Sequence, residues 1–129
     1  MERLEQFKKS LRYAFRGLDY VVRHEKNFQN QLVAAILVMI AMIYFNLAKW
    51  EIVLLFLVIM VTLIMELLNT VMERVVDMLK PSVHPYAKLI KDLMAAAVLV
   101  TSILAVVIGI VIFSPHLKMA FSGLPRILF

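Results

Sequence analysis

Three apolar stretches and one amphipathic stretch divide the chain. The apolar stretches cover residues 32–48, 52–72 and 93–113. A helix that crosses the hydrocarbon core of a bilayer needs about 20 residues, within a range of about 17–25. The pattern therefore predicts three transmembrane helices. The second reaches spanning length only if two polar residues, Glu66 and Asn69, lie within the membrane.

Residues 1–31 follow a different pattern. Apolar side chains recur at spacings of three and four, with basic side chains between them, at Leu4, Phe7, Leu11, Ala14, Leu18 and Val21. Such a helix lies in the membrane interface with its apolar face toward the lipid. We predict an interfacial helix over residues 1–31, which stays in the mature protein because no cleavage pattern follows the first apolar stretch.

The connections are predicted to be short. Residues 46–51 form a tight turn between the first two spans, and the proline-containing segment 80–85 separates the second from the third. Proline cannot continue a helix from within, so Pro115 is expected to end the third span and leave residues 114–129 as a tail.

Composition supports the membrane class. Hydrophobic residues make up 63% of the 129 residues and charged residues 18%, against about 45–50% and about 25% in soluble domains. Mean hydropathy is +0.88. The absence of cysteine excludes disulfide scaffolds and thiolate metal sites. We predict an all-α integral membrane protein with one domain, residues 1–129.

The basic residues predict the orientation. Of the 14 Lys and Arg residues, seven precede the first span, one lies in the first turn, four lie between spans two and three, and two lie in the tail. The positive-inside rule then places the N-terminus in the cytoplasm and the C-terminus outside. The same rule accounts for the net charge of +5, so no nucleic-acid partner is predicted.

The second predicted span carries an unusual polar face. It consists of Glu66, Asn69, Thr70, Glu73 and Asp77, which fall within an arc of about 100° at about 3.6 residues per turn. Glu66 lies roughly 10 Å deeper than Glu73 at about 1.5 Å rise per residue. A charged carboxylate at that depth costs a few kcal/mol, so Glu66 should face protein, a cavity or a cation.

Two further polar groups are expected on the cytoplasmic side. They are Arg23, His24, Glu25 and Asn27 before the first span, and Lys88, Lys91 and Asp92 at the start of the third. Carboxylates such as Glu25, Glu73 and Asp77 suit a hard cation with oxygen ligands, most simply Mg²⁺. Lys91 can neutralise a phosphate, and Glu66, in a poorly solvated setting, takes up a proton readily.

Together these groups indicate phosphoryl transfer to a lipid hydroxyl. The chain has three glycines and no glycine-rich phosphate loop, so side chains and helix ends must hold any nucleotide. Structural interpretations stay open: an inter-helix hydrogen bond for Glu66, solvated ion pairs for Glu73 and Asp77, and snorkelling for Lys91. A non-enzymatic ion or proton pathway also stays open, although carboxylates confined to one half of the membrane favour the kinase.

Three motifs resemble one family, the small bacterial membrane lipid kinases that phosphorylate diacylglycerol or undecaprenol. The segment from Glu66 to Asp77 matches E-x-x-N-[ST]-x-x-E-x-x-x-D. Lys91-Asp92 with residues 95–99 resembles K-D-x-x-A-A-A-V-L, and residues 13–18 followed by Glu25 resemble an aromatic-basic-Gly element and its acid. The likeness covers roughly residues 7–115.

The resemblance implies a homotrimer with active sites shared between subunits, ATP as phosphate donor, and a bacterial inner-membrane location. It implies the following roles: Glu66 as catalytic base; Glu25 and Glu73 as metal ligands; and Tyr13, Glu25, Asn69, Glu73, Lys91 and Asp92 as contacts of the metal-bound nucleotide. No role is implied for Asp77. Gln6 and Gln31 depart from the residues that some members carry, and residues 118–129 extend past the family core.

The local variants around two of these motifs favour undecaprenol over diacylglycerol as the lipid alcohol. Residues 84–88, His-Pro-Tyr-Ala-Lys, and residues 25–27, Glu-Lys-Asn, look more like the undecaprenol kinases.

Overall fold

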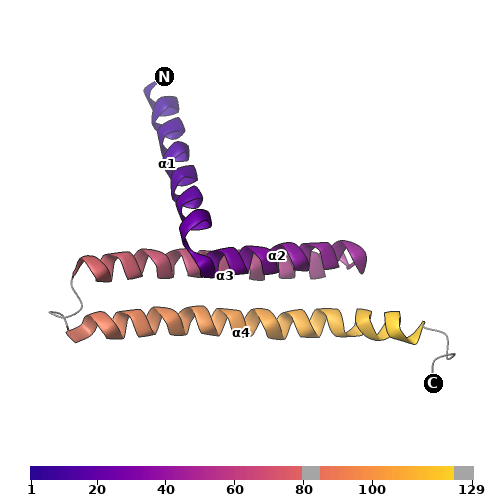
Figure 1. Ribbon diagram of the computed structural model, residues 1–129. Coiled ribbons are helices and arrows are strands. Elements are labelled where there is room, and N and C mark those ends of the chain that lie inside the picture. Colours follow the sequence, from indigo (N-terminus) through magenta and orange to yellow (C-terminus); the bar gives the residue numbers. More distant parts are fainter. Residues whose placement is uncertain (80–84, 124–129) are drawn as a thin grey trace.

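The computed structural model describes residues 1–79 and 85–123, and its regular structure there is entirely α-helical. The elements are α1 (Glu2–His24), α2 (Lys26–Tyr44), α3 (Lys49–Met78) and α4 (Pro85–Ser122). The helix α3 packs against both α2 and α4, whereas α1 points away from this group (Figure 1).

The helices α2, α3 and α4 are each long and apolar enough to cross a membrane. They have 19, 30 and 38 residues, respectively. This confirms the predicted all-α membrane protein with three spanning helices. Residues 80–84 of the predicted break and residues 124–129 of the predicted tail lie outside the described residues.

The helix α1 keeps the amphipathic pattern that its sequence predicts. Acidic residues stand in its first turn and basic residues in its last, where each interacts favourably with the helix dipole. Among its apolar residues Val21 is buried, whereas Leu4, Phe7 and Leu11 are exposed. An apolar stripe with no protein cover fits a membrane surface, and the interfacial position of α1 stays a prediction.

The boundary between the first two elements differs from the prediction. Glu25 has an extended backbone (φ −105°, ψ 106°), so α1 ends at His24 and residues 26–31 belong to α2 rather than to the interfacial helix. The Glu25 N–H still bonds the Val21 carbonyl, and the Glu25 carbonyl accepts from Gln29 N–H. A break that keeps these hydrogen bonds needs neither glycine nor proline, and the helical periodicity on both sides hides it.

The turn between α2 and α3 is shorter than predicted, because α3 already begins at Lys49. Asn46 adopts φ 52°, a left-handed conformation that asparagine tolerates better than most residues. The Glu51 carboxylate accepts a hydrogen bond from Ala48 N–H at 2.9 Å and lies 3.2 Å from His116 Nε2 of α4. These contacts tie the start of α3 to the far end of α4.

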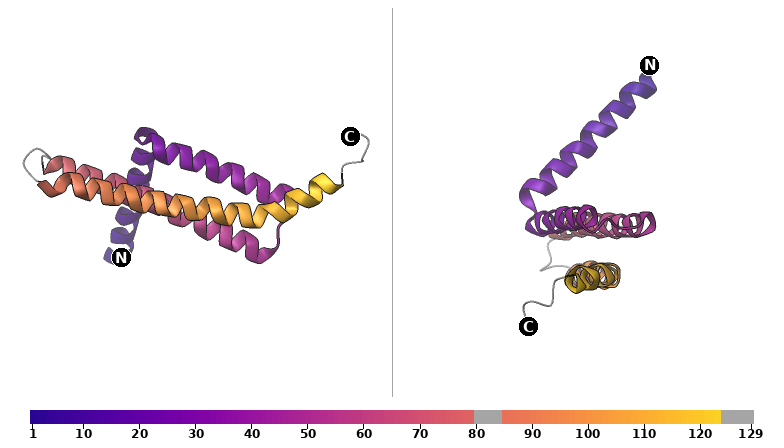
Figure 2. Two further views of the ribbon diagram at one scale, coloured as in Figure 1. Left: turned by 90° about the horizontal axis from the view of Figure 1, so that it is seen from below. Right: turned by 90° about the vertical axis from the view of Figure 1, so that its right-hand side faces the viewer.

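The helix α4 does not end at Pro115, contrary to the prediction, but continues to Ser122. The predicted tail 114–129 therefore begins as helix. Proline removes one backbone hydrogen bond, whereas ending the helix in apolar surroundings would leave several backbone groups unpaired. Figure 2 shows that α4 changes direction in its C-terminal part, as expected of a helix that contains proline.

The interior of a single chain is small. One buried cluster, formed by Met42, Leu47, Leu55 and Ile112, lies where the three spanning helices meet near the Glu51–His116 contact. Most large apolar side chains of α2, α3 and α4 are exposed in the isolated chain. Lipid or other protein subunits must cover these surfaces.

Candidate active site on the polar face of α3

The deeper part of the polar face of α3 is buried, as the sequence predicts. Glu66, Asn69 and Thr70 are only 2%, 7% and 4% exposed, respectively. The Thr70 hydroxyl donates to the Glu66 backbone carbonyl at 3.0 Å, which satisfies this hydroxyl within the helix. Glu66 therefore faces protein, as expected for a carboxylate at this depth.

The helix α2 supplies the partner of the Glu66 carboxylate. The Gln31 amide Nε2 donates a hydrogen bond to Glu66 Oε2 at 3.1 Å. Asn27, also on α2, and the carboxylates of Glu25 and Glu73 lie close enough to influence the charge of Glu66. Four oxygen-bearing side chains thus gather around one buried carboxylate.

One helical turn further along α3, Asn69 and Glu73 interact with each other. Asn69 Nδ2 donates to Glu73 Oε1 at 3.3 Å. The Asn69 Oδ1 atom is buried and accepts no hydrogen bond from the described residues. A buried carbonyl oxygen without a partner is uncommon, and this oxygen is available to bind a ligand.

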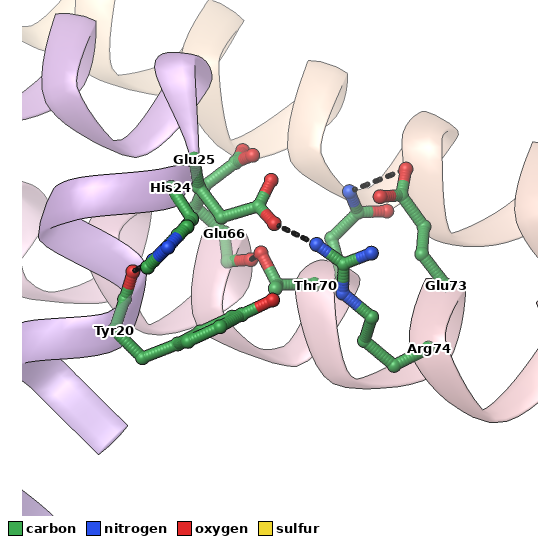
Figure 3. A network of polar contacts seen from close by, with 8 residues as sticks. Tyr20, His24, Glu25, Glu66, Thr70, Glu73 and Arg74 are labelled. Carbon is green, nitrogen blue, oxygen red and sulfur yellow. Dashed lines mark hydrogen bonds and ion pairs between the residues drawn. The ribbon is translucent and has the colours of Figure 1, made fainter. Parts of the chain in front are cut away.

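The break at Glu25 brings that carboxylate to α3. Glu25 Oε1 accepts a hydrogen bond from Arg74 Nη2 at 2.6 Å, and the Glu25 side chain is 18% exposed. The Arg74 guanidinium lies 5.9 Å from the centre of the Tyr20 ring, which stacks on His24 (Figure 3). Figure 3 shows Glu25 and Glu66 close together. Glu73, which accepts the hydrogen bond from Asn69, lies further along α3.

The residues predicted to contact the nucleotide on α4 and α1 are not part of the cluster around Glu66. Lys91 Nζ of α4 bonds Asp77 Oδ1 at 2.6 Å, and both side chains are substantially exposed. Asp92 is exposed, and Tyr13 is 64% exposed on the projecting helix α1. The single chain therefore brings Glu25, Glu66, Asn69 and Glu73 together but leaves Tyr13 and Asp92 apart.

Several oxygen atoms near Glu66 are of the kind that bind Mg²⁺. Within residues 1–79 and 85–123 no group of three or more His, Asp or Glu side chains could hold a metal ion. Mg²⁺ in phosphoryl-transfer sites, however, is usually bound by one or two carboxylates together with substrate phosphates. Glu25, Glu73 and the unpaired Asn69 Oδ1 provide hard oxygen ligands that fit this mode.

Three contacts between helices were not predicted from the sequence. Arg74 bonds Glu25, and Asp77 bonds Lys91. Gln31 stood out only as a departure from a family residue, yet it bonds Glu66. No spacing rule links residues on different helices, so only the tertiary arrangement reveals these pairs.

An apolar groove extends from this site along the three spanning helices. Its volume is about 500 Å³, and its lining includes Gln31 and Ala34 of α2, Leu63 of α3, and Gly109 and Phe113 of α4. Gln31 is thus shared between the groove and the surroundings of Glu66.

Comparison with known proteins gives consistent matches. Residues 12–113 match the family described as prokaryotic diacylglycerol kinase. The chain is 40% identical to the undecaprenol kinase of Bacillus subtilis (strain 168) over 114 residues, 88% of this chain and 93% of that protein. It is 36% identical to the diacylglycerol kinase of Synechocystis sp. over 84% of this chain and 62% of that protein. It is 30% identical to the diacylglycerol kinase of Escherichia coli (strain K12) over 84% of this chain and 88% of that protein.

Proposed function

The chain belongs to the prokaryotic diacylglycerol kinase family. We propose that it transfers the γ-phosphoryl group of ATP to a membrane lipid alcohol and that undecaprenol is the preferred acceptor. One observation carries the proposal. Glu66 is a buried carboxylate on a helix long enough to cross a membrane, and a second carboxylate, Glu73, lies two turns further along the same face. A lipid hydroxyl and a nucleotide phosphate need groups at these two depths.

Glu66 is the proposed catalytic base. Its carboxylate takes the proton from the lipid hydroxyl as the hydroxyl oxygen forms a bond with the γ-phosphorus. The bond between the γ-phosphorus and the oxygen that bridges it to the β-phosphate breaks, and its electron pair leaves with ADP. Burial of Glu66 excludes water, which would otherwise compete with the lipid as acceptor.

Glu25, Glu73 and Asn69 are the proposed ligands of Mg²⁺ and, through it, of the nucleotide. Glu25 offers Oε2, since Oε1 is held by Arg74, and Asn69 offers its unpaired Oδ1. When bound by these residues, Mg²⁺ would supply positive charge to offset the charge that develops during transfer. Arg74 keeps Glu25 oriented toward α3.

Lys91, Asp92 and Tyr13 are the proposed nucleotide contacts. An exposed ion pair such as Lys91–Asp77 contributes only about 0–1 kcal/mol, so Lys91 can exchange Asp77 for a phosphate at little cost. Tyr13 lies on α1, which projects away from the spanning helices, and large apolar side chains of the spanning helices are exposed in the isolated chain. Both observations support a homotrimer in which Tyr13 contributes to a neighbouring subunit's site.

The proposed orientation can be tested with introduced cysteines, because the chain has none of its own. In intact cells, Lys49→Cys should react with a membrane-impermeant maleimide, whereas Lys8→Cys and Lys88→Cys should react only after permeabilisation. All three lysines are exposed, so accessibility reports the side of the membrane. Labelling of Lys49→Cys only after permeabilisation would reverse the topology and separate Glu73 from cytoplasmic ATP.

The preferred lipid can be tested by direct competition. Purified protein in mixed micelles with MgATP should phosphorylate undecaprenol with a kcat/KM severalfold higher than that for diacylglycerol. The motif variants near Glu25 and Lys88 and the similarity to an undecaprenol kinase support this order. Diacylglycerol should still react, because an apolar groove discriminates poorly between long chains.

Two other results of this competition would change the proposal. A higher kcat/KM for diacylglycerol would make the chain a diacylglycerol kinase, the alternative that the Synechocystis and Escherichia coli relatives favour. Phosphorylation of neither lipid would favour the non-enzymatic ion or proton pathway.

A further inference from the structure

Gln31 occupies a position that the proposed mechanism does not explain. Its amide Nε2 donates to Glu66 Oε2 at 3.1 Å from a different helix. Its carbonyl Oε1 is buried and accepts no hydrogen bond within the described part of the chain. Burying a carbonyl oxygen without a hydrogen bond lowers the stability of the folded state, so a functional role for this amide would explain its position.

The surroundings of Gln31 restrict its choice of partner. The groove wall beside it is mostly apolar, with Ala34 and Leu63 among the lining residues. Thr62, a polar residue of the same wall, donates its hydroxyl to the Val58 carbonyl. Glu66 is therefore the partner that fixes the amide, and the amide in turn fixes the carboxylate.

We infer that Gln31 is a positioning residue that engages Glu66 Oε2 and thereby directs Oε1 toward the hydroxyl of the lipid alcohol. This inference rests on the proposed role of Glu66 as base. With Oε2 held, the hydroxyl proton passes to Oε1, where it is not shared with Gln31. Without the amide, the carboxylate can rotate about its side-chain bonds and present either oxygen in several directions.

Replacement of Gln31 by leucine tests this role. Leucine has a similar size and suits an apolar wall, so Gln31→Leu should still fold. Loss of a hydrogen bond to a charged group should lower kcat by roughly ten- to a hundredfold, with the KM for MgATP nearly unchanged. A purely structural defect should instead raise the KM for MgATP or lower the yield of folded protein along with kcat.

Two comparisons separate positioning from a structural effect. Asn30→Ala removes an exposed amide next to Gln31 and should leave kcat and the KM for MgATP unchanged. Gln31→Glu keeps the size of the side chain but removes the amide donor to Glu66, so it should lower kcat as Gln31→Leu does, with the KM for MgATP nearly unchanged. In a Glu66→Gln background, Gln31→Leu should have little further effect, because both changes act through one carboxylate.

The outcomes distinguish this inference from the proposed function. If Gln31→Leu matched Asn30→Ala in kcat, or if its effect multiplied with that of Glu66→Gln, positioning by Gln31 would be wrong and the kinase would stand. If the wild-type chain phosphorylated no lipid alcohol, both would be overturned.

Discussion

Replacement of Glu66 by glutamine is expected to lower kcat by about 10²–10⁴-fold, the usual effect of losing a general base. Glutamine keeps the shape of the side chain and can still meet the Gln31 amide, but it cannot take the proton from the lipid hydroxyl. MgATP should bind almost as before, because the proposed metal ligands lie elsewhere on α3 and at the α1–α2 break. Turnover of undecaprenol at saturating MgATP, with nucleotide affinity determined separately, measures the two effects.

Glu51→Gln is the matched control for this variant. It makes the same change on the same helix, at the opposite end, where the carboxylate contacts His116 and Ala48 N–H. We expect Glu51→Gln to lower thermal stability modestly and to leave kcat close to the wild-type value. Wild-type turnover by Glu66→Gln would show that another group is the base.

Replacement of Glu73 by glutamine should act on the metal instead. Removing one of two proposed carboxylate ligands should raise the Mg²⁺ concentration for half-maximal rate, and the KM for MgATP, by at least about tenfold. The glutamine carbonyl can still accept the hydrogen bond from Asn69 Nδ2, so local packing should persist. Initial rates over a titration of Mg²⁺ at fixed ATP provide the measurement.

The same titration with Glu25→Gln should give a shift in the same direction, and with Glu51→Gln no shift. If Glu73→Gln instead lowered kcat at saturating Mg²⁺ with an unchanged midpoint, Glu73 would act in the chemical step rather than in metal binding. Glu66 and Glu73 would then both act in the chemical step.

The helices were predictable because local sequence determines them. Apolar runs of spanning length give α2, α3 and α4, and the spacing of apolar residues gives α1. The boundaries were less predictable. The break at Glu25 keeps backbone hydrogen bonds on both sides, so no residue type in the sequence marks it. Pro115 is visible in the sequence, but proline can either end a helix or be accommodated within it, and α4 continues through it.

The same distinction applies to the site. Residues 66, 69, 70 and 73 lie on one helix, whose geometry fixes their relative positions, and the burial of Glu66, Asn69 and Thr70 follows from the cost of a polar face in lipid. Contacts between helices, such as Gln31–Glu66 and Glu25–Arg74, depend on how α2 and α1 meet α3. Sequence spacing carries no information about that arrangement.

Because α3 is longer than the bilayer core is thick, the depth of the site depends on bilayer thickness. Its 30 residues extend roughly 45 Å, whereas the hydrocarbon core measures about 30 Å. With Lys49 at one interface, Glu66 lies about 26 Å along the helix, just inside the hydrocarbon, and Glu73 about 36 Å along, among the headgroups. A thinner bilayer would bring the headgroups to the level of Glu66, and a thicker one would draw Glu73 into the hydrocarbon. The acyl-chain length of the host membrane therefore sets the depth of both carboxylates relative to the lipid headgroups.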